Sequence, residues 1–290
     1  MSNSNGWRFK NYLSLVKFSH TIFAMPFALI GLFLAYRSTP SNFSWQLLGM
    51  VILCMIFARN AAMSFNRVVD RYIDSKNPRT AQREIPIGII SAKSALLFTI
   101  LNSVLFIVTT WFINNLVFFL SPIALAVILL YSFTKRWTIL CHLVLGLGLS
   151  LAPIGAYLSV TGRFDFIPIL YSFIVLFWVG GFDIIYSLQD EEFDKNESLK
   201  SIPAKLGAKY ALWIATALHV ITACIVIYVG YKLGASSWYW AGAILFIALL
   251  AYQHSIISPN DIKRVNLAFA TTNGVASIIF AAFNILNFLL

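Results

Sequence analysis

The sequence contains few charged residues. Aspartate, glutamate, lysine and arginine together make up only 11% of the 290 residues, and the mean hydropathy is +0.79. A soluble domain carries about 25% charged residues, so this composition excludes an ordinary soluble protein. Hydrophobic residues account for 59% of the chain. We therefore expect an integral membrane protein that crosses the bilayer several times.

Cysteine and histidine are also scarce. The three cysteines, Cys54, Cys141 and Cys224, lie inside apolar runs, and helix packing explains them better than a disulfide or metal framework. The four histidines are scattered, and no two of them have the spacing of metal ligands. We interpret them as helix-packing residues. The sequence thus argues against a metal site built from sulfur or imidazole.

Long apolar runs make up most of the chain instead. A membrane-spanning helix needs about 20 mostly apolar residues. Nine segments qualify, near 18–36, 45–65, 95–113, 116–132, 139–160, 166–187, 210–230, 237–257 and 265–288. The polar stretch Met1 to Lys17 has no small-residue cleavage site after it, so we interpret it as a cytoplasmic tail. We predict an all-α bundle of nine transmembrane helices that forms one domain over residues 1–290.

Lysine and arginine are distributed unevenly over the connections between these segments. With the N-terminus inside, seventeen of them fall on the inner side and only three, Arg37, Arg163 and Lys232, on the outer side. Cytoplasmic loops are enriched in these residues, so the two long polar connections, 66–93 and 188–209, are expected on the cytoplasmic face. The net charge of +10 then reflects topology and attraction to the lipid bilayer, and we expect no nucleic-acid partner.

Each long polar connection begins with two aspartates four residues apart. They are Asp70 and Asp74 in the first connection and Asp190 and Asp194 in the second, with Asn66 and Tyr186 one turn earlier. On a helix this spacing places the side chains one turn apart on one face. A basic-x-Ile-Pro element follows each pair, and four predicted spans separate the two motifs. We therefore expect both motifs at one membrane face, as an internal repeat of a metal–phosphate site at 66–86 and 183–203.

The acidic motifs predict a magnesium site. Carboxylates crowded in a place of low dielectric constant repel one another unless cations lie between them. Oxygen ligands without histidine or cysteine favour Mg²⁺, which commonly joins one or two carboxylates to substrate phosphates. The expected ligands are Asn66, Asp70, Asp74, Asp190 and Asp194. Solvated helix ends would be the simpler interpretation of one Asp-x-x-x-Asp, but two corresponding copies argue against it.

Basic residues near the motifs suit a diphosphate. Arg79 and Arg83 follow the first aspartate pair, and Lys135 and Arg136 lie at the inner end of the fourth predicted span. Guanidinium and ammonium groups bind phosphate oxygens and would neutralise a departing diphosphate. The enrichment of cytoplasmic loops in basic residues is the alternative explanation for each of them.

Arg59 lies inside the second predicted span, seven residues before Asn66, and Asp183 has the same relation to Asp190. An arginine within the membrane costs roughly 2.5–3.5 kcal/mol on insertion scales, so it should have a partner or a function. Arg59 is a candidate for holding an acceptor's carboxylate in the deeper part of the cavity. The alternative is a structural Arg59–Asp183 ion pair that holds the repeats together.

The motifs resemble those of a known family. Asn66-x-x-x-Asp70-x-x-x-Asp74 and Tyr186-x-x-x-Asp190-x-x-x-Asp194, together with the 131–136 segment Tyr-Ser-Phe-Thr-Lys-Arg, resemble the signatures of the UbiA superfamily of intramembrane prenyltransferases. The residues that flank the motifs are similar to those of the 4-hydroxybenzoate polyprenyltransferase-like branch. This branch includes members assigned to menaquinone synthesis by the futalosine route. Many family members carry Arg-Pro-Leu where this chain has Arg-Glu-Ile-Pro at 83–86.

The resemblance implies a nine-helix bundle whose cavity is capped by the two motif loops. Mg²⁺ on the acidic motifs would bind a polyprenyl diphosphate, and an aromatic acceptor would capture the allyl cation at a ring carbon. The implied catalytic residues are the four motif aspartates and Lys135. Those implied for substrate binding are Arg59, Arg79, Arg83, Tyr131, Lys135, Arg136, Asp183 and Tyr186. The implied setting is ubiquinone or menaquinone biosynthesis at a bacterial inner membrane, with the site on the cytoplasmic face.

Two other classes of protein share some of these features. A membrane transporter also carries repeated charges within the membrane, but the charges are expected at its midplane, whereas here they lie at the ends of the predicted helices. A CDP-alcohol phosphotransferase also depends on Mg²⁺, but its compact aspartate and glycine motif is not found around Asp70 or Asp190. The residues alone leave the acceptor open among 4-hydroxybenzoate, a naphthoate and a futalosine derivative.

Overall fold

The computed structural model describes residues 9–16 and 23–290. Within these residues the secondary structure is helical and contains no β-strand. The α-helices are α1 (Phe9–Leu15), α2 (Met25–Ser38), α3 (Trp45–Val69), α4 (Arg71–Lys76), α5 (Ala92–Trp111), α6 (Asn115–Trp137), α7 (Cys141–Thr161), α8 (Phe166–Ser187), α9 (Glu191–Asn196), α10 (Ile202–Leu233), α11 (Ser237–Ser255) and α12 (Asn273–Leu289). Short 3₁₀ turns lie at Pro40–Asn42 and Leu188–Asp190, and a π-helical turn at Leu267–Thr272 precedes α12.

The predicted membrane-spanning segments coincide with helices. In the described part of the chain, seven helices are long and apolar enough to cross a bilayer: α3, α5, α6, α7, α8 with its continuation into α9, α10, and α12 with its preceding turn. The span predicted at 18–36 corresponds to α2, which has 14 residues, and residues 18–22 lie outside the described part. The span predicted at 237–257 corresponds to α11, whose aromatic start and polar end lower its hydropathy. The all-helical prediction is confirmed, with seven candidate spans.

Local sequence determines where the helices begin and end. Ser44, Ser91 and Asn114 precede α3, α5 and α6, and their side-chain oxygens accept hydrogen bonds of 2.9–3.1 Å from backbone N–H groups three residues later. Gly162 and Gly234 follow α7 and α10 with φ of 63° and 55°, a conformation that favours glycine. These caps permit the short connections that make successive helices antiparallel.

The half of the bundle formed by α2, α8, α11 and α12 is filled by aromatic side chains. Phe27, Trp178, Phe246 and Phe280 are completely buried, and their neighbouring ring centroids are 4.8–6.5 Å apart. Such pairs add about 0.5–1.5 kcal/mol each beyond the burial of their area. This solid core holds α8, and with it the second acidic motif, in place.

Glycines allow α7 to approach two neighbouring helices closely. A Cβ atom added to Gly31 of α2 would overlap the carbonyl oxygen of Pro153 in α7. A Cβ atom added to Gly146 of α7 would overlap the carbonyl oxygen of Leu176 in α8. Small residues at such contacts let helix backbones pack directly against each other in a membrane. Helix α7 is thereby fixed between α2 and α8.

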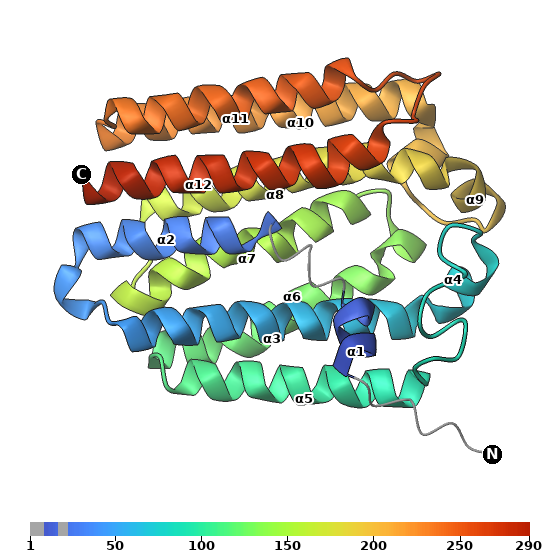
Figure 1. The fold of residues 1–290 in the computed structure, drawn as a ribbon, viewed down its shortest axis with the longest axis horizontal. Coiled ribbons are helices and arrows are strands. Elements are labelled where there is room, and N and C mark those ends of the chain that lie inside the picture. The colour runs from blue at the N-terminus through green and yellow to red at the C-terminus, as the bar shows by residue number, and fades with distance from the viewer. Residues whose placement is uncertain (1–8, 17–22) are drawn as a thin grey trace.

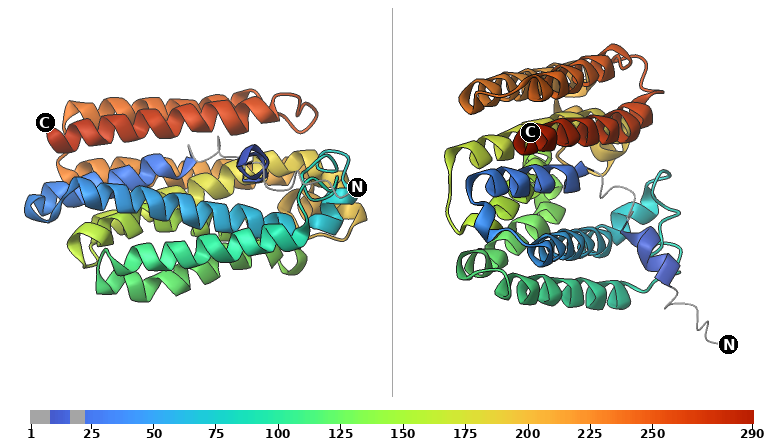
Figure 2. Two further views of the ribbon diagram at one scale, coloured as in Figure 1. Left: turned by 60° about the horizontal axis from the view of Figure 1, so that its bottom comes forward. Right: turned by 60° about the vertical axis from the view of Figure 1, so that its left-hand side comes forward.

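The two acidic motifs lie at the same end of the bundle. Figures 1 and 2 show α4 and α9 together at one end, and the C-terminus at the other. An ion pair between Lys76 Nζ and Glu197 Oε2, 2.7 Å long, joins the segments that follow the motifs. The expectation that segments 66–86 and 183–203 meet is therefore fulfilled in the fold.

The motif helices break where a continuous helix was expected. Helix α3 ends at Val69. The next residue, Asp70, has φ −89° and ψ 4°, and the corresponding Asp190 has φ −105° and ψ 5°. A six-residue helix, α4 or α9, then carries the second aspartate of each motif, Asp74 or Asp194. The backbone N–H of Asp74 still donates to the Asp70 carbonyl oxygen at 2.7 Å. The break turns the short helices across the end of the cavity, so both aspartates of each motif line it.

We predict that Gly146→Ala lowers the thermal unfolding temperature of the detergent-solubilised protein. The added methyl group meets a backbone carbonyl that cannot move aside, and such overpacking costs about 1–3 kcal/mol. Gly49→Ala is the matched control, because a Cβ atom there has nothing within 4 Å. Equal unfolding temperatures for the two variants would contradict the close α7–α8 contact.

Candidate active site

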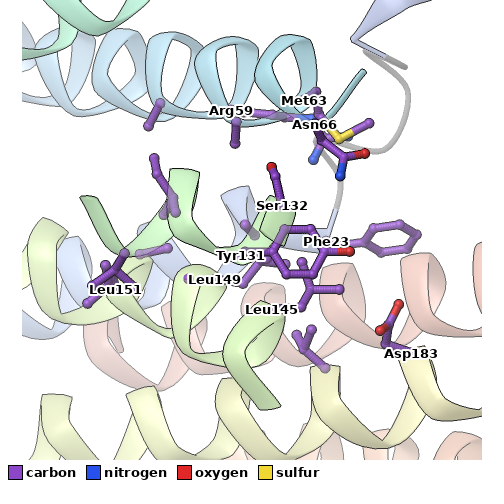
Figure 3. A pocket seen from close by; sticks show the side chains of 18 of the residues that line it. Phe23, Arg59, Met63, Asn66, Tyr131, Ser132, Leu145, Leu149, Leu151 and Asp183 are labelled. Carbon is purple, nitrogen blue, oxygen red and sulfur yellow. The ribbon is translucent and has the colours of Figure 1, made fainter. Parts of the chain in front are cut away.

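A cavity of about 620 Å³ lies between α3, α5, α6, α7 and α8. Its wall on α6 runs from Val117 to Lys135, which corresponds to about 27 Å of helix. The lining is polar at the motif end, where both acidic motifs contribute to it, and mostly apolar toward the opposite end. Figure 3 shows part of this cavity, with polar side chains from α3, α6 and α8 facing the same space. Its shape suits an elongated molecule with an anionic head and an apolar tail.

Asp70 is held by cations from α6. Lys135 Nζ lies 3.0 Å from one Asp70 oxygen, and Arg136 Nη2 lies 3.3 Å from the other. Arg136 also donates to the Val69 carbonyl oxygen at 2.8 Å, and Asn66 Nδ2 donates to Asp70 at 3.1 Å. Asp70 itself is buried, so these contacts compensate a carboxylate that has little access to water.

Asp190 of the second motif is held by residues that follow the first. Arg79 Nε and Asn77 Nδ2 both donate to Asp190 Oδ1 at 2.9 Å, and Arg79 Nη1 donates to the Tyr186 hydroxyl at 3.0 Å. Burial alone would lower the pKa of Arg79, but its hydrogen bonds to Asp190 and the charge of that carboxylate outweigh burial and raise the pKa. Arg79 therefore stays positively charged and connects the two motifs.

Asp74 has one paired and one unpaired oxygen. Arg83 Nη1 lies 2.7 Å from Asp74 Oδ1, while Asp74 Oδ2 is buried without a hydrogen-bond partner. An unsatisfied buried acceptor costs about 1–3 kcal/mol, so a ligand at this oxygen would remove a penalty. Within the described residues, no three acidic, histidine or cysteine side chains form a metal-binding group by themselves. A magnesium ion commonly takes only one or two carboxylates and completes its shell with water and substrate phosphates. The residues present therefore fit that ion.

The structure brings the predicted site residues together. Those that line the cavity are Arg59, Asn66, Asp70, Asp74, Arg79, Arg83, Tyr131, Lys135, Asp183, Tyr186, Asp190 and Asp194. Arg136 is absent from the lining but contacts Asp70 from the side. Their predicted roles in catalysis, substrate binding and metal binding remain proposals.

Asp183 does not form the structural ion pair with Arg59 that was considered as an alternative, but pairs with His142. Asp183 Oδ2 lies 2.7 Å from His142 Nδ1 of α7 rather than forming an ion pair with Arg59. His142 Nε2 in turn accepts a hydrogen bond from the Ile202 backbone N–H at 3.3 Å. Figure 3 shows Arg59 and Asp183 on opposite sides of the pocket, with Tyr131 and Ser132 between them. His142 thus makes a hydrogen bond between two helices, as the interpretation as a hydrogen-bonded packing residue expects, but its partner is Asp183 of the second acidic motif, which was not predicted.

Several polar residues that line the cavity were not predicted as site residues, among them Asn77, His142, Arg67 and Ser132. His142 lines the cavity beside Asp183, and the only available signal was that an acid inside a membrane segment needs a partner. Arg67 also lines the cavity, and among the described residues its buried Nε has no hydrogen-bond partner. Its position directly after Asn66 of the first motif was the sequence signal that could have identified it. Ser132 also lines it, but no pattern in the sequence distinguishes this serine from those that hydrogen-bond within their helix.

The fold and the site together are those of a helical membrane protein with a long cavity that is lined by acidic and basic side chains at one end. A family model described as the UbiA prenyltransferase family matches residues 24–284. The chain belongs to this family. The protein is thus a prenyltransferase, as the motifs predicted, and the transporter and phosphotransferase interpretations are set aside.

Individual relatives and solved structures agree with this assignment. A 4-hydroxybenzoate octaprenyltransferase of Aliivibrio fischeri (strain MJ11) is 30% identical over 254 residues, which cover 88% of this chain and 87% of the relative. The structure of a UbiA homolog from Aeropyrum pernix K1 has a TM-score of 0.84 and 30% identity, covering 93% of this chain and 98% of that chain. A UbiA homolog from Archaeoglobus fulgidus, solved bound to GPP and Mg²⁺, shares the fold with a TM-score of 0.73 at 23% identity, covering 97% and 100%.

We predict that His142→Ala destabilises the protein strongly. Removing one partner of a buried pair leaves an uncompensated charge and costs about 3–5 kcal/mol. The double variant His142→Ala/Asp183→Asn should recover much of this loss, because the remaining amide is neutral. Thermal unfolding of the two single variants and the double variant measures the coupling. Purely additive losses would contradict the pairing.

Proposed function

We propose that the protein transfers a polyprenyl group from a polyprenyl diphosphate to a ring carbon of a 4-hydroxybenzoate-like acceptor, in ubiquinone or menaquinone biosynthesis. The main support for this proposal is the arrangement of charged residues in the cavity. Acidic and basic side chains from two distant motifs interlock at the polar end of a long apolar cavity. The names of the curated relatives support the acceptor class. A different aromatic acceptor for the same reaction is the principal alternative.

The basic residues would bind the diphosphate and stabilise it as it leaves. Arg79, Arg83 and Lys135 line the cavity, and Arg136 reinforces Asp70 from the side. When the allylic C–O bond breaks, negative charge develops on the diphosphate oxygens. Preorganised cations at that position lower the barrier, because they are worth more in a water-poor site than in water. In the structure these cations rest on the motif aspartates, which keeps them oriented toward the same space.

The oxygen-rich motif residues Asn66, Asp70, Asp74, Asp190 and Asp194 would hold Mg²⁺. When bound, the ion would supply Lewis-acid stabilisation of the diphosphate's developing charge. The unpartnered Asp74 Oδ2 and the Mg²⁺ and GPP bound by the structural neighbour support this assignment.

The apolar part of the cavity would hold the prenyl tail and exclude water from the allyl cation. Gly155 of α7 lines this part, and a Cβ atom added there would meet nothing within 4 Å. A glycine inside a helix costs about 0.5–1 kcal/mol relative to alanine. At this position it leaves open the space that a tail would fill.

The acceptor would bind between the diphosphate position and the deeper cavity. Arg59, Tyr131, Asp183 and Tyr186 line this region, and Phe269 stacks on the Tyr186 ring with a centroid distance of 4.0 Å. An arginine charge suits the carboxylate of an aromatic acid, while flat aromatic walls suit the ring. His142 would keep Asp183 oriented.

The excess of basic residues at the motif end supports a cytoplasmic site. We place the protein in a bacterial inner membrane with nine spans, α2 and α11 being the two that complete the seven long apolar helices. A polyprenyl diphosphate could then enter from the lipid with its head at the cytoplasmic face. The whole chain would act as one catalytic domain in which residues 66–86 and 183–203 form the repeated site.

We predict that Asp70→Ala and Asp190→Ala each reduce prenyl transfer by at least about 10²–10³-fold, and that chelation of divalent metal has the same effect. The purified protein would be assayed with Mg²⁺, a labelled polyprenyl diphosphate and 4-hydroxybenzoate. Glu197→Gln is the control, because Glu197 lies at the same end but outside the cavity, and its exposed pair with Lys76 contributes little. Wild-type rates in either aspartate variant would remove the site assignment.

We predict that Gly155→Leu shifts substrate preference toward shorter prenyl diphosphates. A Cβ atom at this position has nothing within 4 Å, so the new side chain is expected to extend into the apolar cavity, and turnover of a short donor should survive while longer donors lose activity. Gly49→Leu introduces the same side chain into open space outside the cavity and should leave the preference unchanged. The measurement is kcat/KM over a ladder of donor lengths. An unchanged ladder in Gly155→Leu would place the tail elsewhere.

A further inference from the structure

Among the described residues, two serines in transmembrane helices, Ser132 and Ser172, have a buried hydroxyl without a hydrogen-bond partner, and of these two only Ser132 lines the cavity. Ser150 and Ser159 of α7 donate to carbonyl oxygens of their own helix at 2.8 Å. Thr134, two residues after Ser132, donates to the Tyr131 carbonyl oxygen at 2.7 Å. No residue in the described part of the chain gives the hydroxyl of Ser132 a hydrogen-bond partner, although Ser132 is only 1% exposed.

An unpaired hydroxyl at this depth is energetically unfavourable. Leaving a buried polar group unsatisfied costs about 1–3 kcal/mol, and an alanine of nearly the same size would avoid that cost. Ser132 lines the cavity. A ligand that packs against this part of the wall can therefore supply the missing partner.

The surroundings of the hydroxyl define which part of the substrate it meets. Figure 3 shows Ser132 directed from α6 toward α3, where Arg59 and Asn66 lie, with Tyr131 beside it. Lys135, which contacts Asp70, lies three residues further along α6, about one helical turn nearer the motif end. Ser132 is thus set deeper than the proposed diphosphate position, in the region assigned to the acceptor.

We propose that Ser132 is a specificity-determining residue that donates a hydrogen bond to a carboxylate oxygen of the aromatic acceptor. The positive charge of Arg59 favours an anionic group in this region, and a carboxylate has two oxygens, so it can accept from both side chains. The inference rests on the proposed function and narrows its substrate class. The site selects aromatic acids over neutral phenols of the same shape.

The test compares wild type with Ser132→Ala, Ser132→Thr and Ser150→Ala. Two acceptors of nearly equal shape are used, 4-hydroxybenzoate and its neutral analogue 4-hydroxybenzamide. Ser132→Ala is expected to raise the KM for 4-hydroxybenzoate roughly 10- to 100-fold, as loss of a hydrogen bond to a charged group would. The KM for the prenyl diphosphate and the weak use of the amide should stay unchanged. Ser132→Thr keeps the hydroxyl and should restore the acid preference.

Ser150→Ala controls for the removal of a buried serine hydroxyl as such. Ser150 is buried, with 3% exposure, but it bonds to its own helix and is not among the residues that line the cavity. An equal KM for 4-hydroxybenzoate in wild type and Ser132→Ala would overturn the inference. A loss that affects both substrates equally, or a lowered unfolding temperature without a change in KM, would also overturn it and assign Ser132 a structural role.

A binding measurement separates this inference from the proposed function. Wild type should unfold at a higher temperature in the presence of 4-hydroxybenzoate, and Ser132→Ala should lose that shift while keeping the shift given by geranyl diphosphate with Mg²⁺. If the acid stabilises wild type but not Ser132→Ala and no transfer occurs, the proposed reaction fails while the inference stands. If transfer occurs with equal KM in both proteins, the inference fails and the reaction stands. Stabilisation by the acid in neither protein would overturn the inference.

Discussion

The interlocked ion pairs between the two acidic motifs and the basic residues around them are the constraint on which the site depends. Asp70, Asp74 and Asp190 lie at the end of a membrane bundle with little access to water. Asp70 and Asp190 are compensated by cations from other segments, and Asp74 is compensated by Arg83 of its own motif segment. Isolated charges in such a place would cost several kcal/mol each. The pairs therefore fix how α6 and the loops after α3 and α8 must meet, and they hold the motifs at one end of the cavity.

The bundle has one half that is filled by aromatic side chains and one half that contains the cavity. Around Trp178 and Phe246 the aromatic side chains leave no space, and the glycine contacts of α7 bring it directly against α2 and α8. On the other side, α6 turns a full stripe of side chains toward the cavity. A rigid half can keep the second motif stationary, so that the open half can accept a long apolar chain without disturbing the distances between charged groups.

Much of this arrangement follows from the sequence because it rests on periodicity and charge. The spacing of Asp70 from Asp74, repeated at Asp190, identified the site, and hydropathy identified seven of the candidate spans. The His142–Asp183 pair was not predictable, because it joins residues 41 positions apart on two apolar helices. The helix breaks at Asp70 and Asp190 were missed too, since backbone conformation there depends on contacts between the motifs. Ser132 carries no sequence signal, because only the structure shows that its hydroxyl lacks the usual bond within the helix.

In the proposed function, the same pairs that stabilise the protein would also prepare it for an anionic substrate. Arg79 and Lys135 are already oriented by carboxylates and only partly exposed, so a diphosphate would not bear the full cost of ordering them. In the proposed function, a carboxylate that loses its arginine would gain a metal ion, and an arginine that loses its carboxylate would gain a phosphate oxygen. The number of charge pairs would thus be preserved when the site fills. Aspartates without cationic partners would bind metal more readily, but they would destabilise the protein when no metal is bound. The ion pairs between the motifs and the surrounding basic residues avoid this loss of stability.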